Sequence, residues 1–162
     1  MKLFDTKIIS ISNQKGGVGK TTSSVNIATY LAASEIPTLI IDMDPQANST
    51  SGLGIEIQND IKSIYDVIIK EVSPEDAIQK TSLDYLDIIP SSSQLVGAEI
   101  ELVSEISREY MLKEALEKIK GKYKYIIIDS PPSLGLLTLN VLSASNSIII
   151  PIQCEYYALE GL

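Results

Sequence analysis

The sequence predicts an α/β fold with a mostly parallel, twisted sheet of about five strands and helices on both faces. Short runs that are almost entirely apolar alternate along the chain with longer segments whose apolar residues recur at helical spacing. Runs of the first kind are typical of strands buried on both faces of a parallel sheet. Strands that alternate with helices imply right-handed crossovers. At 162 residues the chain suits a single domain with a full core.

In the first half of the chain, apolar spacing and helix breakers define the elements. Ile27 and Leu31 share a stripe of the first helix, and Pro37 bars its continuation. Ser73 and Pro74 have the pattern of an N-cap serine followed by proline at the first helical position. We expect a strand at 7–12, a helix at about 20–33, a strand at 38–41, a loop or short irregular helix at 47–54, a helical segment at 61–68 and a helix after Ser73.

The second half continues the alternation and contains the most apolar strand. The serines at 91–93 are expected to cap a helix on which Leu95, Leu102 and Ile106 share one face. Gly121 suits the position just beyond the C-terminus of the next helix. The expected elements are a strand at 86–89, the helix after Ser93, a helix at about 111–119, a strand at 125–128, a helix at 136–144 and a strand at 147–152.

Composition excludes several classes of function. The chain has no histidine, which excludes Ser-His-Asp and Cys-His nucleophile systems and any histidine-ligated metal, but leaves carboxylate and hydroxyl ligands for a hard cation. Its apolar runs are too short to span a membrane, and the N-terminus lacks the pattern of a secretory signal. The single cysteine, Cys154, fits a reducing compartment and is expected to be a packed apolar residue. We therefore expect a cytoplasmic location.

The net charge of −8 argues against binding of nucleic acid by bulk electrostatics. A local group of lysines is the exception: Lys113, Lys118, Lys120, Lys122 and Lys124. We interpret them as a solvated helix face whose cations lie near the helix C-terminus, where the helix dipole favours them.

The stretch 14–22 has the features of a phosphate-binding loop. It lies between the first strand and the first helix. Glycines let backbone N–H groups approach a phosphate chain closely, and the helix N-terminus adds the positive end of its dipole. Lys20 can reach the β- and γ-phosphates, and the Thr21 hydroxyl can hold Mg²⁺. The general pattern G-x-x-x-x-G-K-[ST] would place glycine at position 14, where this chain has glutamine followed by a second lysine, Lys15.

Three carboxylates follow apolar strands: Asp42 and Asp44 after the second strand, and Asp129 after the strand at 125–128. In open parallel sheets ligands bind at the carboxyl ends of the strands, so we expect these side chains beside the phosphate loop. Asp129 fits a role in holding Mg²⁺ through a coordinated water, and Asp44 could orient or deprotonate the water that attacks the γ-phosphate. Asp42 could support the water shell of the metal, or it could anchor a loop or cap a helix.

The stretch KGGVGKTT at 15–22 resembles the deviant Walker A loop of the ParA and MinD group of P-loop NTPases. LIIDMDPQANST at 39–50 looks like the Walker A′ stretch of the ParA/Soj chromosome or plasmid partition ATPases. YIIIDSPPSLGLLTLN at 125–140 is similar to their Walker B and switch II region, and IIPIQCEYYALEGL at 149–162 to their next strand and turn. The resemblance implies one P-loop ATPase domain over residues 1–162, shortened at its C-terminus.

The motifs and the resemblance together predict a nucleotide site. The resemblance implies that Lys15 reaches the phosphates of the partner subunit in a nucleotide-sandwich homodimer, and that Asp44 serves the attacking water. The predicted residues are Lys15, Lys20 and Asp44 for catalysis; Lys15, Gly16, Gly17, Val18, Gly19, Lys20, Thr21 and Thr22 for binding of ATP; and Thr21, Asp42 and Asp129 for binding of Mg²⁺.

The resemblance also implies a biological role. Such ATPases dimerise on ATP, separate on hydrolysis, and act in partitioning with a ParB-type partner and non-specific DNA of the nucleoid, without a membrane. Family members continue beyond the last expected strand, so we expect this chain to hydrolyse ATP and bind DNA only weakly. Two alternatives stay open: a nucleotide-gated regulator without relevant turnover, and a MinD-like membrane-associated ATPase, which needs a C-terminal amphipathic helix.

Overall fold

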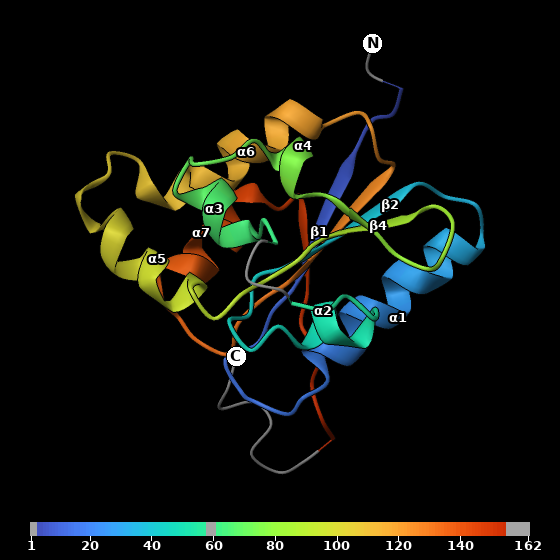
Figure 1. Cartoon of the computed structure of the whole chain (residues 1–162). Helices are drawn as coiled ribbons and strands as arrows, with labels where there is room; N and C mark the ends of the chain where they lie inside the picture. The colour runs from blue at the N-terminus through green and yellow to red at the C-terminus, as the bar shows by residue number, and fades with distance from the viewer. Residues whose placement is uncertain (1–2, 58–60, 155–162) are drawn as a thin grey trace.

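One six-stranded sheet forms the centre of residues 3–57 and 61–154, the part of the chain that the computed structural model describes (Figure 1). The strand order is β3-β4-β2-β5-β1-β6, and all neighbouring pairs are parallel except β3 with β4. Ile9, Ile127, Ile40 and Ile88 lie in register across its middle. The predicted α/β fold with a mostly parallel sheet is confirmed. The strands are β1 (Lys7–Ile11), β2 (Thr38–Asp42), β3 (Gln79–Lys80), β4 (Leu86–Ile89), β5 (Tyr125–Asp129) and β6 (Ser147–Ile149).

Helices cover both faces of this sheet (Figure 1). On one face, Ala28 and Ala32 of α1 pack against alternate strand residues such as Ile40 and Ile127. On the other face, a larger apolar cluster joins the sheet to α3, α4, α5, α6 and α7. The helices are α1 (Lys20–Ala33), α2 (Asn48–Gly52), α3 (Ile64–Ile68), α4 (Pro74–Ala77), α5 (Leu95–Glu101), α6 (Met111–Ile119) and α7 (Leu136–Ala144), with 3-10 turns η1 (Leu102–Ser104) and η2 (Arg108–Tyr110). None of the helices in the described ranges is long and apolar enough to cross a bilayer.

The strand order brings the predicted functional segments to one edge of the sheet. β5 lies between β1 and β2, so Asp129 is in register with Ile11 on one side and with Asp42 on the other. Hydrogen bonds beyond the ladder tie these ends together: Met43 N donates to Asp129 O at 2.9 Å, and Ser130 Oγ donates to Ile11 O at 2.9 Å. The segments that follow the three strands therefore start from fixed, adjacent positions.

Several predicted bounds agree with the structure. The helices predicted at 20–33, 111–119 and 136–144 have those bounds, and the strand at 86–89 is β4. Gly121 has a φ of 96° and follows Lys120, the C-cap of α6, as its predicted position requires. The segment at 47–54 contains the short helix α2, one of the two predicted forms.

Three predictions were wrong. Ile106 shares no face with Leu95 and Leu102, because α5 ends at Glu101, and Ile106 is 89% exposed. The predicted serine cap is absent: α5 has Gln94 at its N-cap, with no side-chain hydrogen bond there. The strand predicted at 147–152 ends at Ile149, and Pro151 has no N–H with which to extend the ladder. The two-residue strand β3 was missed, since it is too short to give a side-chain period.

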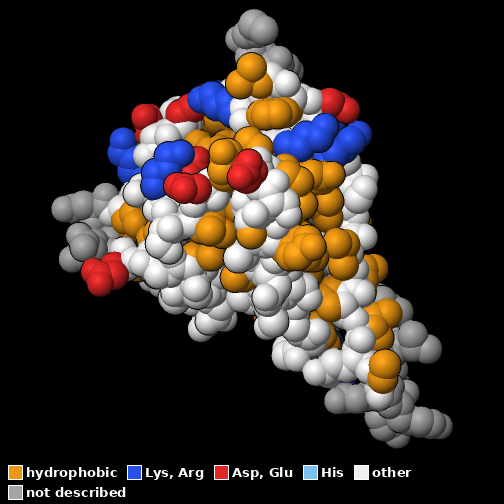
Figure 2. All heavy atoms as spheres, turned by 90° about the vertical axis from the view of Figure 1, so that its right-hand side faces the viewer, with side chains coloured by type: hydrophobic (Ala, Val, Ile, Leu, Met, Phe, Trp, Pro, Cys, Tyr) orange, Lys and Arg blue, Asp and Glu red, His pale blue; other side chains and the backbone are white. Residues whose placement is uncertain are grey.

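β6 lies at the edge of the sheet with apolar side chains exposed. Ile148 and Ile149 are 48% and 39% exposed, and Ile150 and Ile152 beyond the strand are similar. Figure 2 shows hydrophobic side chains gathered in a band that runs toward the lower right of that view. At the opposite edge of the sheet, the short strand β3 pairs with β4 through two residues.

The buried side chain of Asn140 joins α7 to the start of α6. Its Oδ1 accepts a hydrogen bond from Leu112 N at 3.0 Å, and its Nδ2 donates to Arg108 O at 2.8 Å and to Leu136 O at 3.0 Å. The residue is 0% exposed, so water cannot replace these partners.

Asn140→Ala should therefore lower the free energy of unfolding by about 2–4 kcal/mol, because it leaves buried backbone groups of α6 and η2 without partners. Urea denaturation followed by circular dichroism measures this. Asn26→Ala is the matched control: Asn26 is exposed on α1 and bonds only to Thr22 O within its own helix, so a change within about 0.5 kcal/mol is expected. Equal effects of the two substitutions would contradict the role assigned to Asn140.

Candidate functional site

The loop between β1 and α1 has an open backbone at its glycines. Gly17 and Gly19 have φ angles of 75° and 90°, which side chains rarely adopt, and α1 starts directly after Gly19. A Cβ on Gly16, Gly17 or Gly19 would meet nothing within 4 Å, so these residues border open space. That space is a cavity of about 350 Å³. It is lined by Gly16, Gly17, Gly19, Lys20, Thr21, Thr22, Asp44, Gln46, Asn48 and Pro132.

Lys20 is held inside the loop rather than extended into solvent. It is 7% exposed, and its Nζ donates a hydrogen bond to Lys15 O at 3.0 Å. Burial lowers the pKa of Lys20, while the nearby carboxylates of Asp129 and Asp44 oppose that shift. The ammonium group is thus partly desolvated and lies at the wall of the cavity, where an anionic group could pair with it.

Lys15 is positioned through its backbone. Its N–H donates to Asn13 Oδ1 at 2.9 Å, and Asn13 Nδ2 in turn donates to Pro151 O at 2.9 Å. Gln153 Nε2 donates to Gly17 O at 3.0 Å, so the segment after β6 supports the loop at a second point. Asn13 and Gln153 were not predicted from the sequence, because neither forms part of a phosphate-loop pattern.

Asp129 is a buried carboxylate that accepts hydrogen bonds from two separate helices. It is 0% exposed; Ser24 Oγ donates to its Oδ1 at 3.0 Å and Ser49 Oγ donates to its Oδ2 at 2.7 Å, and the Thr21 side chain lies near enough to lower its pKa. Burial raises the pKa of Asp129, and the hydroxyls of Ser49, Thr21 and Ser24 offset only part of that rise. Thr21 and Asp129, predicted from separate motifs, therefore meet.

Two residues around Asp129 were missed from the sequence. Ser24 lies one helical turn after Lys20 and so shares its face, a signal that could have found it. Ser49 gave no signal, since it lies in a stretch of small polar residues. A hydroxyl and a carboxylate are ligands that suit Mg²⁺, which usually takes few protein ligands and keeps several waters. The donor set at Thr21 and Asp129 fits that ion.

Asp42 is occupied by hydrogen bonds from its own chain. Its Oδ1 accepts from Asp44 N at 3.1 Å, and its Oδ2 accepts from Thr50 N at 2.8 Å and from Thr50 Oγ1 at 2.7 Å. Thr50 Oγ1 in turn accepts from Ser91 N at 3.0 Å. Asp42 is 0% exposed and does not line the cavity. Asp129 is equally buried, but all three donors to Asp42 lie within residues 44–50, which favours the alternative weighed for Asp42, a loop anchor, over support of a metal's water shell.

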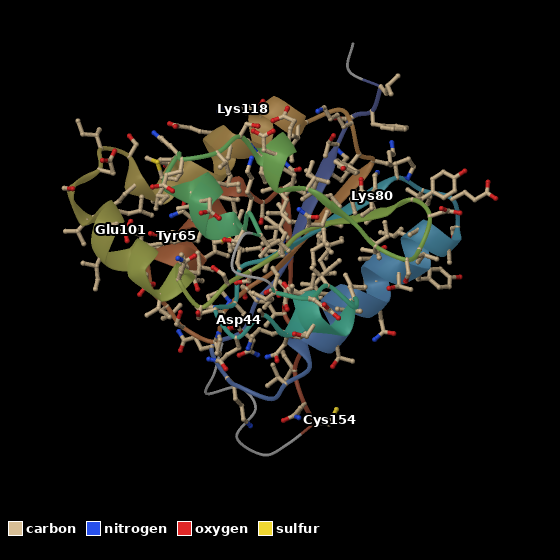
Figure 3. All side chains as sticks on the ribbon, viewed as in Figure 1. Asp44, Tyr65, Lys80, Glu101, Lys118 and Cys154 are labelled. Atoms are coloured by element: carbon tan, nitrogen blue, oxygen red, sulfur yellow. The ribbon has the colours of Figure 1, made fainter. Side chains whose placement is uncertain are left out.

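Asp44 lines the same cavity as the glycines of the phosphate loop (Figure 3). It lies in the segment after β2, where its N–H donates to Asp42. It is 7% exposed, and its Oδ1 accepts a hydrogen bond from Gln46 N at 2.9 Å. That bond closes a tight turn and fixes the carboxylate's direction. Within the described residues, no cluster of three or more acidic or cysteine side chains could by itself hold a metal ion.

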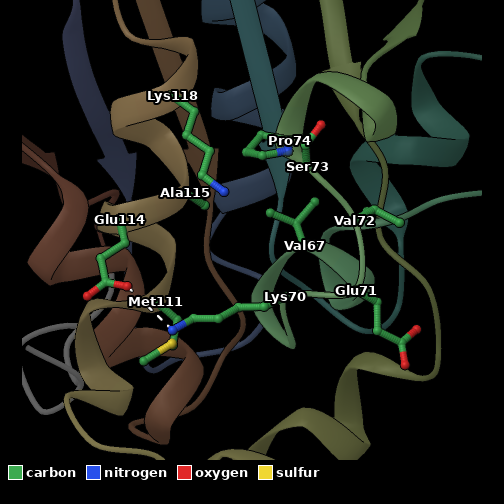
Figure 4. Close-up of a pocket in the computed structure, with 10 residues that line it drawn as sticks. All are labelled: Val67, Lys70, Glu71, Val72, Ser73, Pro74, Met111, Glu114, Ala115 and Lys118. Carbon is green, nitrogen blue, oxygen red and sulfur yellow. Dashed lines mark ion pairs between the residues drawn. The ribbon is translucent and has the colours of Figure 1, made fainter.

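Two features lie away from this site. A cavity of about 260 Å³ between α3, α4 and α6 contains the Lys70–Glu114 ion pair at 3.5 Å and none of the predicted site residues (Figure 4). Cys154 is exposed, so the prediction that it packs as an apolar residue was wrong (Figure 3). The apolar run before Cys154 predicted a longer strand, but β6 ends at Ile149, so Cys154 lies outside the sheet.

A protein-family model described as an AAA domain matches residues 6–162. The chain belongs to the AAA domain family. Within this family the phosphate loop, the segment after β2 and the segment after β5 are thus parts of one matched domain.

Curated relatives of this AAA domain are named for sporulation or for chromosome partitioning. The sporulation initiation inhibitor protein Soj of Bacillus subtilis is 58% identical over 96% of the chain, and the chromosome partitioning protein ParA of Myxococcus xanthus is 53% identical over 96%. The expected similarity to ParA/Soj proteins is confirmed. The chain spans 62% and 55% of the length of these two relatives.

Among solved structures, a cobyrinic acid a,c-diamide synthase of Mycobacterium smegmatis with bound ADP and magnesium has a TM-score of 0.93 and 39% identity. The superposition covers 97% of this AAA domain and 64% of that chain. The P-loop NTPase fold predicted from the motifs is therefore confirmed.

Burial raises the pKa of Asp42 from 3.8 to about 6, against the hydrogen bonds from Thr50 that lower it. Since the folded state then binds this proton more readily than the unfolded state, the group's contribution to stability falls as pH rises from about 4 to about 6. A shift of this size corresponds to about 3 kcal/mol. Asp42→Asn has no carboxyl group to titrate here, so it should lack this loss of stability. The free energy of unfolding of the variant should therefore rise relative to that of the wild type between about pH 4 and about pH 6.

Urea denaturation at several pH values between about 4 and 7, without nucleotide or Mg²⁺, measures the difference. Asp84→Asn, at an exposed loop position, is the control and should follow the wild type at every pH. A gap between wild type and Asp42→Asn that stays constant with pH would show that Asp42 does not titrate in this window.

Proposed function

We propose that this chain is the nucleotide-binding part of a Mg²⁺-dependent ATPase that acts as a switch. The observation that carries the proposal is one cavity that Gly16, Gly17, Gly19, Lys20, Thr21, Thr22 and Asp44 line, with the buried Asp129 carboxylate near Thr21. Glycine backbone, a buried ammonium and a helix N-terminus together suit a chain of phosphates. The ADP and magnesium in the Mycobacterium smegmatis structure support ATP and Mg²⁺ as the ligands here.

Each predicted residue except Asp42, which anchors the loop after β2, has a part in this proposal. The backbone from Lys15 to Thr22, Val18 included, surrounds the phosphates, and Lys20 neutralises the terminal ones. Thr21 and Asp129 are the residues that would hold Mg²⁺, which when bound would offset the charge of the phosphates and polarise the γ-phosphoryl group. Asp44, fixed by Gln46 N, orients or deprotonates the attacking water.

Lys15 has a proposed role between subunits. In a homodimer formed on ATP, its ammonium would reach the phosphates of the second subunit and stabilise negative charge there, as arginine fingers do. The loop backbone that Asn13 and Gln153 support would fix the base of that side chain.

The names of the relatives support a partition role. Because Soj and ParA are sporulation and chromosome-partitioning proteins, we propose that the whole protein works in the cytoplasm, on the nucleoid, with a ParB-type partner and non-specific DNA. The DNA-binding surface would lie outside this chain, consistent with its net charge of −8. For this chain alone, we expect weak hydrolysis of ATP and weak binding of DNA.

Substitution of Lys20 by alanine should abolish nucleotide binding, because it removes the one buried cation at the cavity wall among the described residues. We expect at least about a 100-fold loss of affinity for a fluorescent ATP analogue with Mg²⁺, from the loss of a charge-assisted bond to phosphate. Lys113→Ala, at an exposed position on α6, is the control and should bind as the wild type does. Binding by Lys20→Ala at wild-type strength would refute the phosphate site.

Lys15→Ala and Asp44→Ala should instead separate binding from hydrolysis. Both variants should keep nucleotide affinity within a few-fold while single-turnover hydrolysis of labelled ATP falls by about 100-fold or more, since each removes a group needed only in the transition state. If Lys15→Ala hydrolysed ATP at the wild-type rate, the role of Lys15 between subunits would be wrong. If Asp44→Ala did so, Asp44 would have no part in activating water.

A further inference from the structure

The helix α5 and the turn η1 are apolar on two opposite sides. Leu95, Ala98 and Leu102 are buried in the core. On the other side, an outward stripe of Val96, Ile100 and Val103 is 62%, 77% and 61% exposed. A helix at the surface normally turns polar residues outward, and one that is apolar all round is normally covered.

Acidic side chains flank this outward stripe. Between 93 and 110 the sequence has four glutamates and one basic residue, Arg108. The Nη1 of Arg108 donates a hydrogen bond to Val103 O. Glu101 and Glu105 are exposed beside the stripe, and Glu101 accepts hydrogen bonds from Tyr65 OH at 3.0 and 3.2 Å (Figure 3). Burial raises the pKa of Tyr65, and the nearby carboxylates of Glu101, Glu71 and Asp66 raise it further.

We propose that the outward stripe binds an amphipathic helix of a partner protein whose polar face is rich in lysine or arginine. Apolar residues at three- and four-residue spacing match the apolar face of a second helix, and the flanking glutamates match basic residues beside that face. A second copy of this chain fits poorly, because its own glutamates would oppose Glu101 and Glu105 across a symmetric contact. The proposal goes beyond the ATPase and rests on no step of it.

A contact connects α5 to the start of α7. Glu99, on the flank of α5, accepts a hydrogen bond from Leu137 N at 3.4 Å and fills the space where a side chain on Gly135 would lie. Gly135 is the N-cap of α7, which follows the segment after Asp129. α5 therefore packs against the helix that follows the segment after Asp129.

The test uses three labelled peptides and the 162-residue chain. The first is a designed helix with leucine at positions i, i+3, i+4 and i+7 and lysine elsewhere; the second has the same composition without an apolar face; the third has glutamate in place of lysine. Fluorescence anisotropy should detect binding of the first peptide alone, with affinity that falls as salt rises.

Ile100→Ser/Val103→Ser should weaken binding of the first peptide by about tenfold or more. Glu101→Gln/Glu105→Gln, which leaves the apolar stripe intact, should weaken it several-fold and flatten its salt dependence. Tyr30→Ser, at a position on α1 that is 76% exposed, is the matched control and should change nothing. Circular dichroism would verify that each variant is folded.

Other outcomes would overturn the proposal. Absence of binding by the first peptide, or equal binding by the Ile100→Ser/Val103→Ser variant, would exclude the stripe as a site for a basic helix. Equal binding of the acidic peptide would exclude the role of the glutamates. Sedimentation that shows dimers of the wild type and monomers of Ile100→Ser/Val103→Ser, without nucleotide, would assign the stripe to a second copy of the chain instead.

Discussion

The carboxylate of Asp129 is the interaction on which the rest of the site depends. It ends the central strand β5, is removed from water, and is satisfied by hydroxyls from α1 and α2. A buried carboxylate without such donors would be costly, so the start of α1 and the position of α2 are both constrained by it. Since α1 begins at the last glycine of the phosphate loop, the loop is indirectly constrained as well.

Charge explains why a cation belongs to the proposed function. Among the buried side chains of the described residues, Asp42, Asp44 and Asp129 lie at this edge of the sheet with Lys20 as their cation. Burial raises the pKa of Asp42 and of Asp129 and lowers that of Lys20, so burial disfavours the charged form of these three groups. A phosphate chain would add further negative charge. Mg²⁺ at Thr21 and Asp129 would offset that charge, which one ammonium group cannot do alone.

Much of this arrangement could be predicted from the sequence because its signals are local. The glycines and Lys20 follow an apolar run, and Asp42, Asp44 and Asp129 follow others, so strand order alone brings them together. Ser49 and Thr50 could not be found that way, because their partners are 80 and 8 residues away and only the folded chain brings them near. The exposure of Ile106 and Cys154 was also beyond pattern analysis, which assumes that apolar residues pack.

Ser49 and Thr50 connect the helix α2 to the carboxylates of the site. α2 is five residues long, its N-cap Ala47 has a φ of 54° that is unfavourable for alanine, and no side chain caps it. Its stability must therefore come from outside, and two adjacent residues supply it: Ser49 binds Asp129, and Thr50 binds Asp42. Any change in the charge of either carboxylate alters a bond that holds α2. Because Asn48 of the same helix lines the cavity, α2 lies where a change at the phosphates would be felt. The position of this short helix, with its strained N-cap, thus depends on two buried carboxylates of the sheet edge.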